Sequence, residues 1–223
     1  MSFSVEAFDD AGYPATAAAT VMSALPERGS VGLTGGTTAE RLYPHLAGEP
    51  DGWSNIEVLF SDERCVPPDH DESNFKMAAR LLLDPAGIRI VHRMPGEDPP
   101  GQGAERYHHE IAPVVERGID LLLLGMGADA HIGAMFPQSP ALGETEKLCA
   151  AVRRPDGMRG LTLTPPAMLS ARRILLVVTG EGKAETLKRV IQGDEPPSAC
   201  PARLLADHPD ATFLLDASAA AAL

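Results

Sequence analysis

A run of four leucines constrains the fold of this chain more than any other stretch. It lies within residues 120–137, which read DLLLLGMGADAHIGAMFP. The run is too short for a typical helix and apolar on every side, which is typical of a strand buried on both faces of a parallel sheet. Asp129 and His131 follow a glycine turn after this strand. Because ligands of open parallel α/β sheets bind at the carboxyl ends of strands, these two side chains are candidate site residues.

Strand and helix patterns alternate along the rest of the chain. We expect further strands at 2–8, 30–33, 56–60, 89–94, 148–152, 161–164, 174–178 and 212–215. Helical spacing and capping signals predict helices at 13–25, 37–46, after Ser73, over 104–117, up to Ile191 and in the Ala-rich C-terminus. The alternation predicts an α/β fold with a mostly parallel sheet and helices on both faces. No repeat or long linker interrupts it, so we expect a single domain over residues 1–223.

Composition and charge exclude several classes of function. With 31 acidic and 19 basic residues the formal net charge is −12, which argues against nucleic acid or an anionic membrane surface as partner. The three cysteines form no CxxC pair, and their odd number argues against a disulfide framework. The N-terminus lacks the pattern of a secretory signal, and no apolar run approaches 18 residues. A cytoplasmic protein fits these features best.

Four expected strands end in residues that suit a binding site. The endings are TGGTT (34–38), SDER (61–64), GMGADAH (125–131) and TGEGK (179–183). In a parallel sheet the four endings meet at one edge. This convergence indicates a functional site more strongly than any single motif does.

Three of these endings carry groups that suit a phosphate. Gly35, Gly36 and Thr37 open a helix, whose first N–H groups lack internal partners and lie at the positive end of the dipole. Arg64 and Lys183 offer a forked guanidinium and an ammonium. The alternatives are a tight turn in which Thr37 and Glu40 form a capping box, and cations that are only solvated. The spacing of a nucleotide-triphosphate loop is absent, and Pro137 lies only ten residues beyond Gly127, which leaves no room for the helix of a dinucleotide fold.

The fourth ending carries a candidate base. The unperturbed pKa of histidine lies near neutrality, so His131 can take a proton from water, and Asp129 can fix its tautomer. The alternative is a loop histidine without a role. No GxSxG motif or activated cysteine occurs, which leaves serine and cysteine nucleophiles without support. The acidic and histidine clusters at 69–72 and 108–110 have no recognised metal spacing, and we expect no metal.

Five segments together resemble a known family. They are LTGGTTAERLY, VLFSDERCVPPDHDESNFKMA, LLLLGMGADAHIGAMFP, LTLTPPAML and LLVVTGEGKAETLKRVI. In this order they resemble the 6-phosphogluconolactonases, part of a larger group that includes glucosamine-6-phosphate deaminases. The resemblance implies a modified Rossmann-like sheet, no cofactor, and hydrolysis of 6-phospho-D-glucono-1,5-lactone in the pentose phosphate pathway.

The resemblance also implies roles for individual residues. His131 looks like the general base that activates water, with Asp129 as its carboxylate neighbour. Gly35, Gly36, Thr37, Arg64 and Lys183 look like the phosphate clamp. Asp62 occupies the position of a carboxylate that transfers protons in the deaminases, and for a lactonase we expect it only to position substrate.

The chain departs from the family pattern in two places. Ala130 replaces the glycine before the histidine, and Ile132 and Ala134 replace hydroxyl-bearing residues after it. A Cβ at position 130 is costly if that backbone has positive φ. Gly160 stands where the family has an arginine, with Arg159 one residue earlier, so the resemblance carries no substrate contact to either position.

Two other functions fit part of the pattern. Ile132 favours a sugar-phosphate deaminase, whereas Phe136-Pro137, LTLTPP and Arg64 favour the lactonase. A non-catalytic sugar-phosphate-binding regulator would use the same sheet, but the chain has neither a basic patch nor spare length for a DNA-binding module. The expected partner is a small sugar-phosphate lactone, bound by a monomer or small homo-oligomer.

Overall fold

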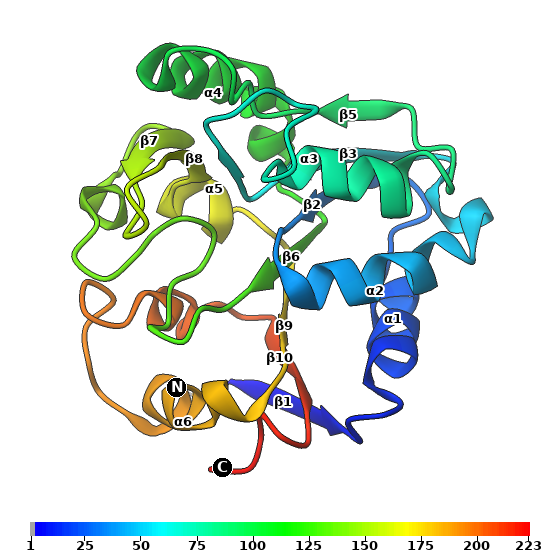
Figure 1. Ribbon diagram of the computed structural model, residues 1–223, viewed down its shortest axis with the longest axis vertical. Helices are drawn as coiled ribbons and strands as arrows, with labels where there is room; N and C mark the ends of the chain where they lie inside the picture. Colours follow the sequence, from blue (N-terminus) through cyan, green and yellow to red (C-terminus); the bar gives the residue numbers. More distant parts are fainter. Residues whose placement is uncertain (1–2) are drawn as a thin grey trace.

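The fold has one large sheet and one small sheet, seen in a computed structural model that describes residues 3–223 (Figure 1). The strands are β1 Ser4–Phe8, β2 Gly29–Leu33, β3 Ile56–Phe60, β4 Asp62–Arg64, β5 Ile90–His92, β6 Leu121–Gly125, β7 Cys149–Arg153, β8 Arg159–Leu163, β9 Arg173–Val178 and β10 Ala211–Asp216. The helices are α1 Tyr13–Ala24, α2 Thr37–Ala47, α3 Asn74–Ala78, α4 Pro100–Arg117, α5 Pro165–Leu169 and α6 Ala184–Gln192. Short 3₁₀ turns and one π turn, Ala79–Leu83, complete the regular structure.

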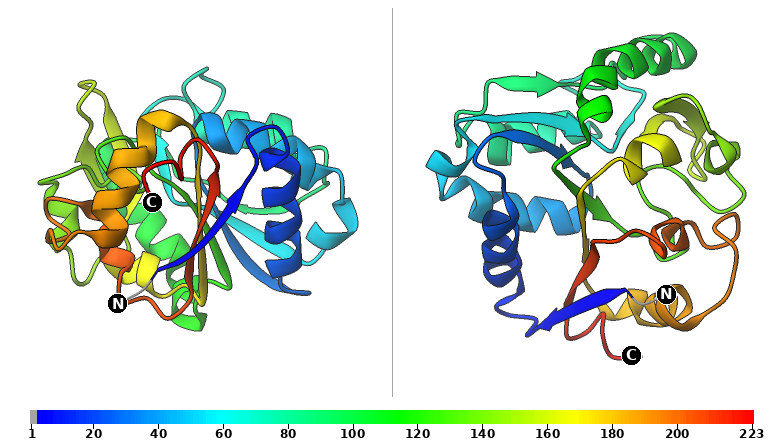
Figure 2. Two further views of the ribbon diagram at one scale, coloured as in Figure 1. Left: turned by 90° about the horizontal axis from the view of Figure 1, so that it is seen from below. Right: turned by 180° about the vertical axis from the view of Figure 1, so that it is seen from behind.

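Seven parallel strands form the large sheet. Their order is β1-β10-β9-β6-β2-β3-β5, and every neighbouring pair is parallel. Helices α1 and α2 lie on one face, and α4 and α6 on the other (Figure 2). The predicted fold class is therefore confirmed.

The leucine run of β6 lies in the middle of this sheet. Leu121 and Leu124 are fully buried, as are the leucines between them. Leu122 pairs with Gly32 of β2, where a Cβ would come within 2.4 Å of the Leu122 side chain. The glycine in β2 therefore makes the space that a leucine in the neighbouring strand fills.

Two local predictions were wrong. Thr37 is not the N-cap of α2, because Gly36 takes that position with φ 91° and no side chain caps the helix. Glu40 pairs instead with Arg80, at 3.3 Å. The Ala-rich residues after β10 form turns rather than a helix, because most of the stability of a helix in a protein comes from packing an amphipathic face, which an alanine run lacks.

The small sheet has the strand order β4-β8-β7 and is antiparallel. It begins immediately after β3, so that SDER leaves the large sheet and starts the small one (Figure 1). Within residues 3–223 no helix is both long and apolar enough to cross a membrane.

Glu63 of β4 holds the loop that follows. Its buried carboxylate accepts hydrogen bonds from the backbone N–H groups of Arg64, Asn74 and Phe75, at 2.7 to 2.8 Å, and from the Ser73 hydroxyl at 2.9 Å. Burial raises the pKa of Glu63, and the four donors oppose that rise. Ser73 caps α3 through a hydrogen bond from the Lys76 N–H, as predicted. One carboxylate thus ties the two ends of the segment from Asp62 to Phe75 together.

We predict that Glu63→Gln destabilises the protein by about 2 kcal/mol or more, because an amide NH₂ would face N–H donors and leave them unsatisfied. Chemical denaturation followed by circular dichroism measures this. Glu6→Gln, on the exposed face of β1, is the matched control and should leave the unfolding free energy unchanged. An equally stable Glu63→Gln variant would contradict the assignment.

Candidate active site

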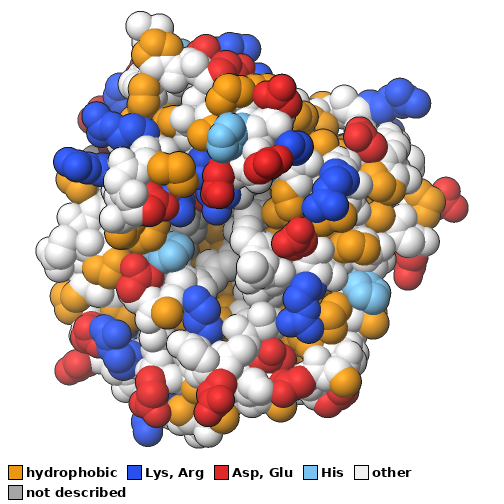
Figure 3. All heavy atoms as spheres, viewed as in Figure 1, with side chains coloured by type: hydrophobic (Ala, Val, Ile, Leu, Met, Phe, Trp, Pro, Cys, Tyr) orange, Lys and Arg blue, Asp and Glu red, His pale blue; other side chains and the backbone are white. Residues whose placement is uncertain are grey.

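The carboxyl ends of β2, β3, β6 and β9 surround a cavity of about 210 Å³. Figure 3 shows the hollow near the middle of one face, with Lys and Arg side chains at its rim. Its lining comprises Thr34, Gly35, Gly36, Thr37, Thr38, Asp62, Arg64, Asn74, Gly125, Met126, Gly127, His131, Gly133, Arg154, Thr179 and Lys183. Every predicted site residue except Asp129 lines this cavity, and Asp129 contacts His131.

The imidazole of His131 is fixed by Asp129. The distance from His131 Nδ1 to Asp129 Oδ1 is 2.6 Å, and the same oxygen accepts the His131 backbone N–H at 3.2 Å. Burial opposes ionisation of Asp129, but the hydrogen bond and the charge of His131 outweigh it and lower the pKa of Asp129 to about 2. An ionised carboxylate accepts a proton-bearing Nδ1, which leaves Nε2 as the basic nitrogen.

Gly127 makes room for this imidazole. A Cβ at position 127 would lie 2.0 Å from His131 Nδ1 and 2.6 Å from Asp129 Oδ1. The Gly127 N–H also donates to the His131 carbonyl at 2.9 Å, so the loop closes on itself. On the other side, the Phe136 ring packs against the imidazole with centroids 4.3 Å apart.

The loop around His131 contains two non-glycine residues in left-handed conformation. Ala130 has φ 68° and Gln138 has φ 64°. The Ala130 carbonyl accepts the Ala202 N–H at 2.9 Å, and the Gln138 N–H donates to the Ser198 carbonyl at 2.8 Å. The left-handed backbone at Ala130 therefore carries the expected conformational cost of about 1–2 kcal/mol. Hydrogen bonds with the segment between Ser198 and Ala202 hold both left-handed residues in place.

The turn between β2 and α2 presents backbone N–H groups to the cavity. The Glu40 N–H donates to the Gly36 carbonyl at 3.0 Å, while the amides of the preceding helical residues have no acceptor in the helix. Gly35 must lack a side chain because a Cβ would lie 2.0 Å from Asn74 Oδ1. Since Thr37 does not cap the helix, its hydroxyl is available at the cavity wall.

The two predicted cations, Arg64 and Lys183, reach the cavity from different elements. Arg64 Nη1 donates to the Glu72 carbonyl, whereas its Nε is the one buried side-chain polar atom without a hydrogen-bond partner in the part of the chain that the structure describes. Lys183, just before α6, forms no ion pair with residues 3–223. Burial lowers the pKa of Lys183, and nearby Asp129 opposes this effect. Both cations have unused capacity for an anion.

The family is decided by comparison with known proteins. The family model described as glucosamine-6-phosphate isomerases/6-phosphogluconolactonase matches residues 10–214. This chain belongs to that family. A 6-phosphogluconolactonase of Synechocystis is 36% identical over 210 residues, covering 89% of this chain and 87% of the relative.

Solved structures agree with the family. A 6-phosphogluconolactonase from Trypanosoma cruzi has a TM-score of 0.86 and 27% identity, over 100% of this chain and 98% of the other. A monomeric glucosamine-6-phosphate deaminase has a TM-score of 0.88 at 22% identity, over 99% of this chain and 100% of the other. The fold is thus shared by both activities, and the residues of the site must distinguish them.

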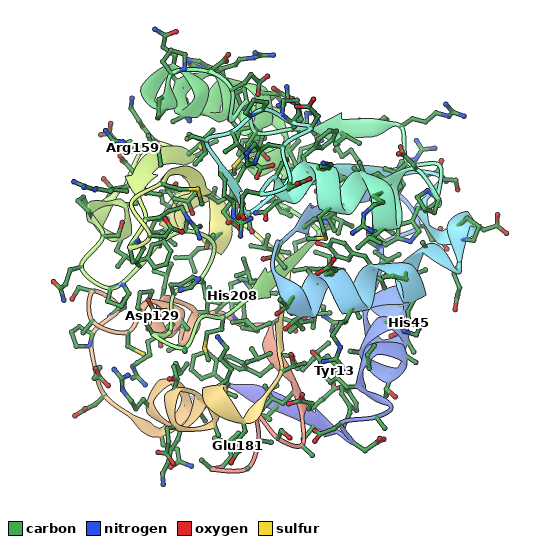
Figure 4. All side chains as sticks on the ribbon, viewed as in Figure 1. Tyr13, His45, Asp129, Arg159, Glu181 and His208 are labelled. Carbon is green, nitrogen blue, oxygen red and sulfur yellow. The ribbon has the colours of Figure 1, made fainter. Side chains whose placement is uncertain are left out.

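Two side chains of the lining, Asn74 and Arg154, lie outside the four strand endings that the sequence predicted. Asn74 donates through Nδ2 to the Asp62 carbonyl at 3.0 Å and to its Oδ2 at 3.2 Å, so it fixes the buried Asp62 carboxylate. Arg154, after β7, also reaches the cavity, whereas Arg159 lies on the outer side of the β7–β8 hairpin (Figure 4). The adjacency of Asn74 to the capping Ser73 could have indicated the first, but no local pattern indicates Arg154.

Clusters considered for metal binding are engaged otherwise. Asp71 pairs with Lys76 at 2.6 Å, and His108 Nδ1 accepts the Leu148 N–H at 3.1 Å. Among residues 3–223 no group of three or more His, Cys, Asp or Glu side chains is placed to hold a metal ion.

We predict that Gly127→Ala lowers catalytic activity by about 10-fold or more, because the new Cβ displaces the imidazole of His131, the candidate base. Steady-state kinetics and thermal unfolding measured together show whether function falls more than stability. Gly182→Ala, in a neighbouring loop with no atom within 4 Å of the new Cβ, is the control and should resemble the unchanged protein. Equal activity in both variants would contradict the packing argument.

Proposed function

We propose that this protein hydrolyses 6-phospho-D-glucono-1,5-lactone to 6-phospho-D-gluconate, as the names of its relatives suggest. The observation that carries the proposal is the His131–Asp129 pair, with 2.6 Å between Nδ1 and Oδ1. His131 lines a cavity that also contains cationic side chains, and Asp62 is the one carboxylate in that lining. A hydrolase needs one oriented base and a held substrate, and this site supplies both without a covalent nucleophile. No cofactor is required for this reaction.

The chemistry follows from the free nitrogen of His131. Nε2 takes a proton from water as the water oxygen bonds to C1 of the lactone, which gives a tetrahedral oxyanion and an imidazolium next to the Asp129 carboxylate. The C1–O5 bond then breaks, the ring oxygen takes the proton from the imidazolium, and the product acid ionises. Backbone N–H groups of the glycine-rich turns are the candidates to stabilise the oxyanion.

The phosphate supplies binding energy away from the reacting carbon. We assign Gly35, Gly36 and Thr37 at the start of α2, with Arg64 and Lys183, to the phosphate clamp. Anchoring the phosphate places C1 against the activated water. Asp62 is buried and held by Asn74 and Ser61, which suits positioning of a substrate hydroxyl.

The decisive assay measures acid release from fresh 6-phosphoglucono-1,5-lactone above its spontaneous rate. Glucosamine 6-phosphate with ammonia detection runs in parallel, since the fold is shared with a deaminase. We expect turnover of the lactone and none of the amino sugar. Turnover of the amino sugar alone would overturn the proposal, and binding without turnover of either would support a regulator. A cytoplasmic location and a monomer or small homo-oligomer remain predictions.

We predict that His131→Ala lowers kcat by about 10²- to 10⁴-fold, because proton transfer to a positioned base contributes that much. KM should change little, since the phosphate clamp is untouched. His45→Ala, on α2 and outside the cavity, is the matched control. Unchanged turnover in His131→Ala would refute the base assignment.

Asp129→Asn should lower kcat/KM about 10-fold or more by removing the charge that favours the imidazolium. Because the pKa of Asp129 is about 2, the carboxylate stays ionised from pH 4 upward, and its own titration produces no acid limb between pH 4 and 9. An Asp129→Asn variant whose kcat/KM equals that of the unchanged protein across this pH range would contradict the orienting role of the carboxylate.

A further inference from the structure

Arg154 is a cation of the site that the proposed mechanism does not use. It follows β7, lines the same cavity as His131, and has a side chain only 14% exposed. Its neighbours in the hairpin, Arg153 and Arg159, are exposed and lie outside this cavity. Of the three arginines in the hairpin, only this one turns inward.

Gly160 gives Arg154 its place. A Cβ at Gly160 would lie 3.4 Å from Arg154 Cδ and 3.2 Å from the Glu63 carbonyl oxygen. The aliphatic stem of Arg154 therefore packs directly against the position where a side chain at 160 would begin. In this chain the inward guanidinium comes from position 154, across a glycine on the adjoining strand.

The Arg154 guanidinium is fixed by a hydrogen bond from Nε and by an aromatic ring, whereas its two Nη groups are unused. Its Nε donates to Asp156 Oδ2 at 3.1 Å, and its Cζ lies 5.5 Å from the centroid of the Phe136 ring. The Nη groups make no hydrogen bond to residues 3–223. An arginine fixed through Nε presents its two Nη groups as a preorganised fork.

Arg64 and Arg154 line the same cavity, and Arg64 pairs in the small sheet with Gly160, against which the Arg154 stem lies. Burial acts to raise the pKa of Asp156, but the Met158 N–H, Arg154 and the charge of Arg64 lower it, which agrees with this placement. Exposed carboxylates pair with both arginines, Asp156 with Arg154 and Glu72 with Arg64 Nη1 at 3.7 Å. The Arg64 Nε and the Arg154 Nη groups nevertheless remain as unused donors on two residues that line the cavity.

We propose that Arg154 is a second arginine of the phosphate site and that, with Arg64, it determines selectivity for a phosphorylated sugar lactone over the unphosphorylated one. A phosphate dianion matches two guanidinium forks in charge and in acceptor geometry. The net charge of −12 repels such a dianion, so a local cluster of cations is required. This inference rests on the proposed function for its substrate, but not for its binding site.

The test compares Arg154→Gln with the matched control Arg159→Gln, which removes the same charge from the same hairpin. Two substrates are used, 6-phosphoglucono-1,5-lactone and glucono-1,5-lactone, and calorimetry measures binding of 6-phosphogluconate and of gluconate. We expect Arg154→Gln to lower kcat/KM for the phosphorylated lactone, and affinity for 6-phosphogluconate, by about 10- to 100-fold. Glucono-1,5-lactone turnover should stay within a factor of about three. Arg154→Lys, which keeps the charge without the fork, should recover part of the loss and confirms that the site still folds.

The remaining outcomes separate this inference from the proposed function. Equal losses on both lactones would mean that Arg154 acts on His131 through Phe136, and would overturn the phosphate assignment. No loss on either lactone would overturn it as well. If the unchanged protein hydrolyses neither lactone, yet Arg154→Gln abolishes its preference for 6-phosphogluconate over gluconate, the inference stands and the proposed function falls. An unchanged protein without that preference would overturn both.

Discussion

Parallel pairing of four buried strands is the constraint on which the rest of the molecule depends. Neighbours β9, β6, β2 and β3 run in the same direction, so segments far apart in the chain end at one edge. The apolar strands are stabilised by burial on both faces, which leaves their ends as the place where polar groups can gather without cost to the core. The cavity is a consequence of that pairing.

Carboxylates orient the functional groups of this acidic chain. Asp129 fixes His131, Glu63 fixes the segment that bears Arg64 and Asn74, and Asp156 holds the Nε of Arg154. In each case the carboxylate binds one side of the residue or segment, and the atoms that could contact a ligand face the cavity. Such support gives a site its precision before substrate arrives.

Much of the fold could be predicted, because long apolar runs and glycine turns determine where strands stand and end. The convergence of Thr37, Arg64, His131 and Lys183 followed from parallel pairing alone. The capping box at Thr37 failed because a glycine with positive φ satisfies the backbone geometry equally well. Arg154 could not be predicted, since its inward direction is set by packing across the hairpin against Gly160, which no local sequence pattern records.

The two left-handed residues of the His131 loop restrict how far this loop can move. Ala130 and Gln138 are both bound to the backbone between Ser198 and Ala202, so the loop is closed at each end by a segment about 60 residues downstream. A loop fastened at both ends has little conformational entropy left to lose when a ligand binds. The cost of these two left-handed residues is therefore offset by contacts made on folding, and the tethered loop holds the His131 imidazole at the cavity wall.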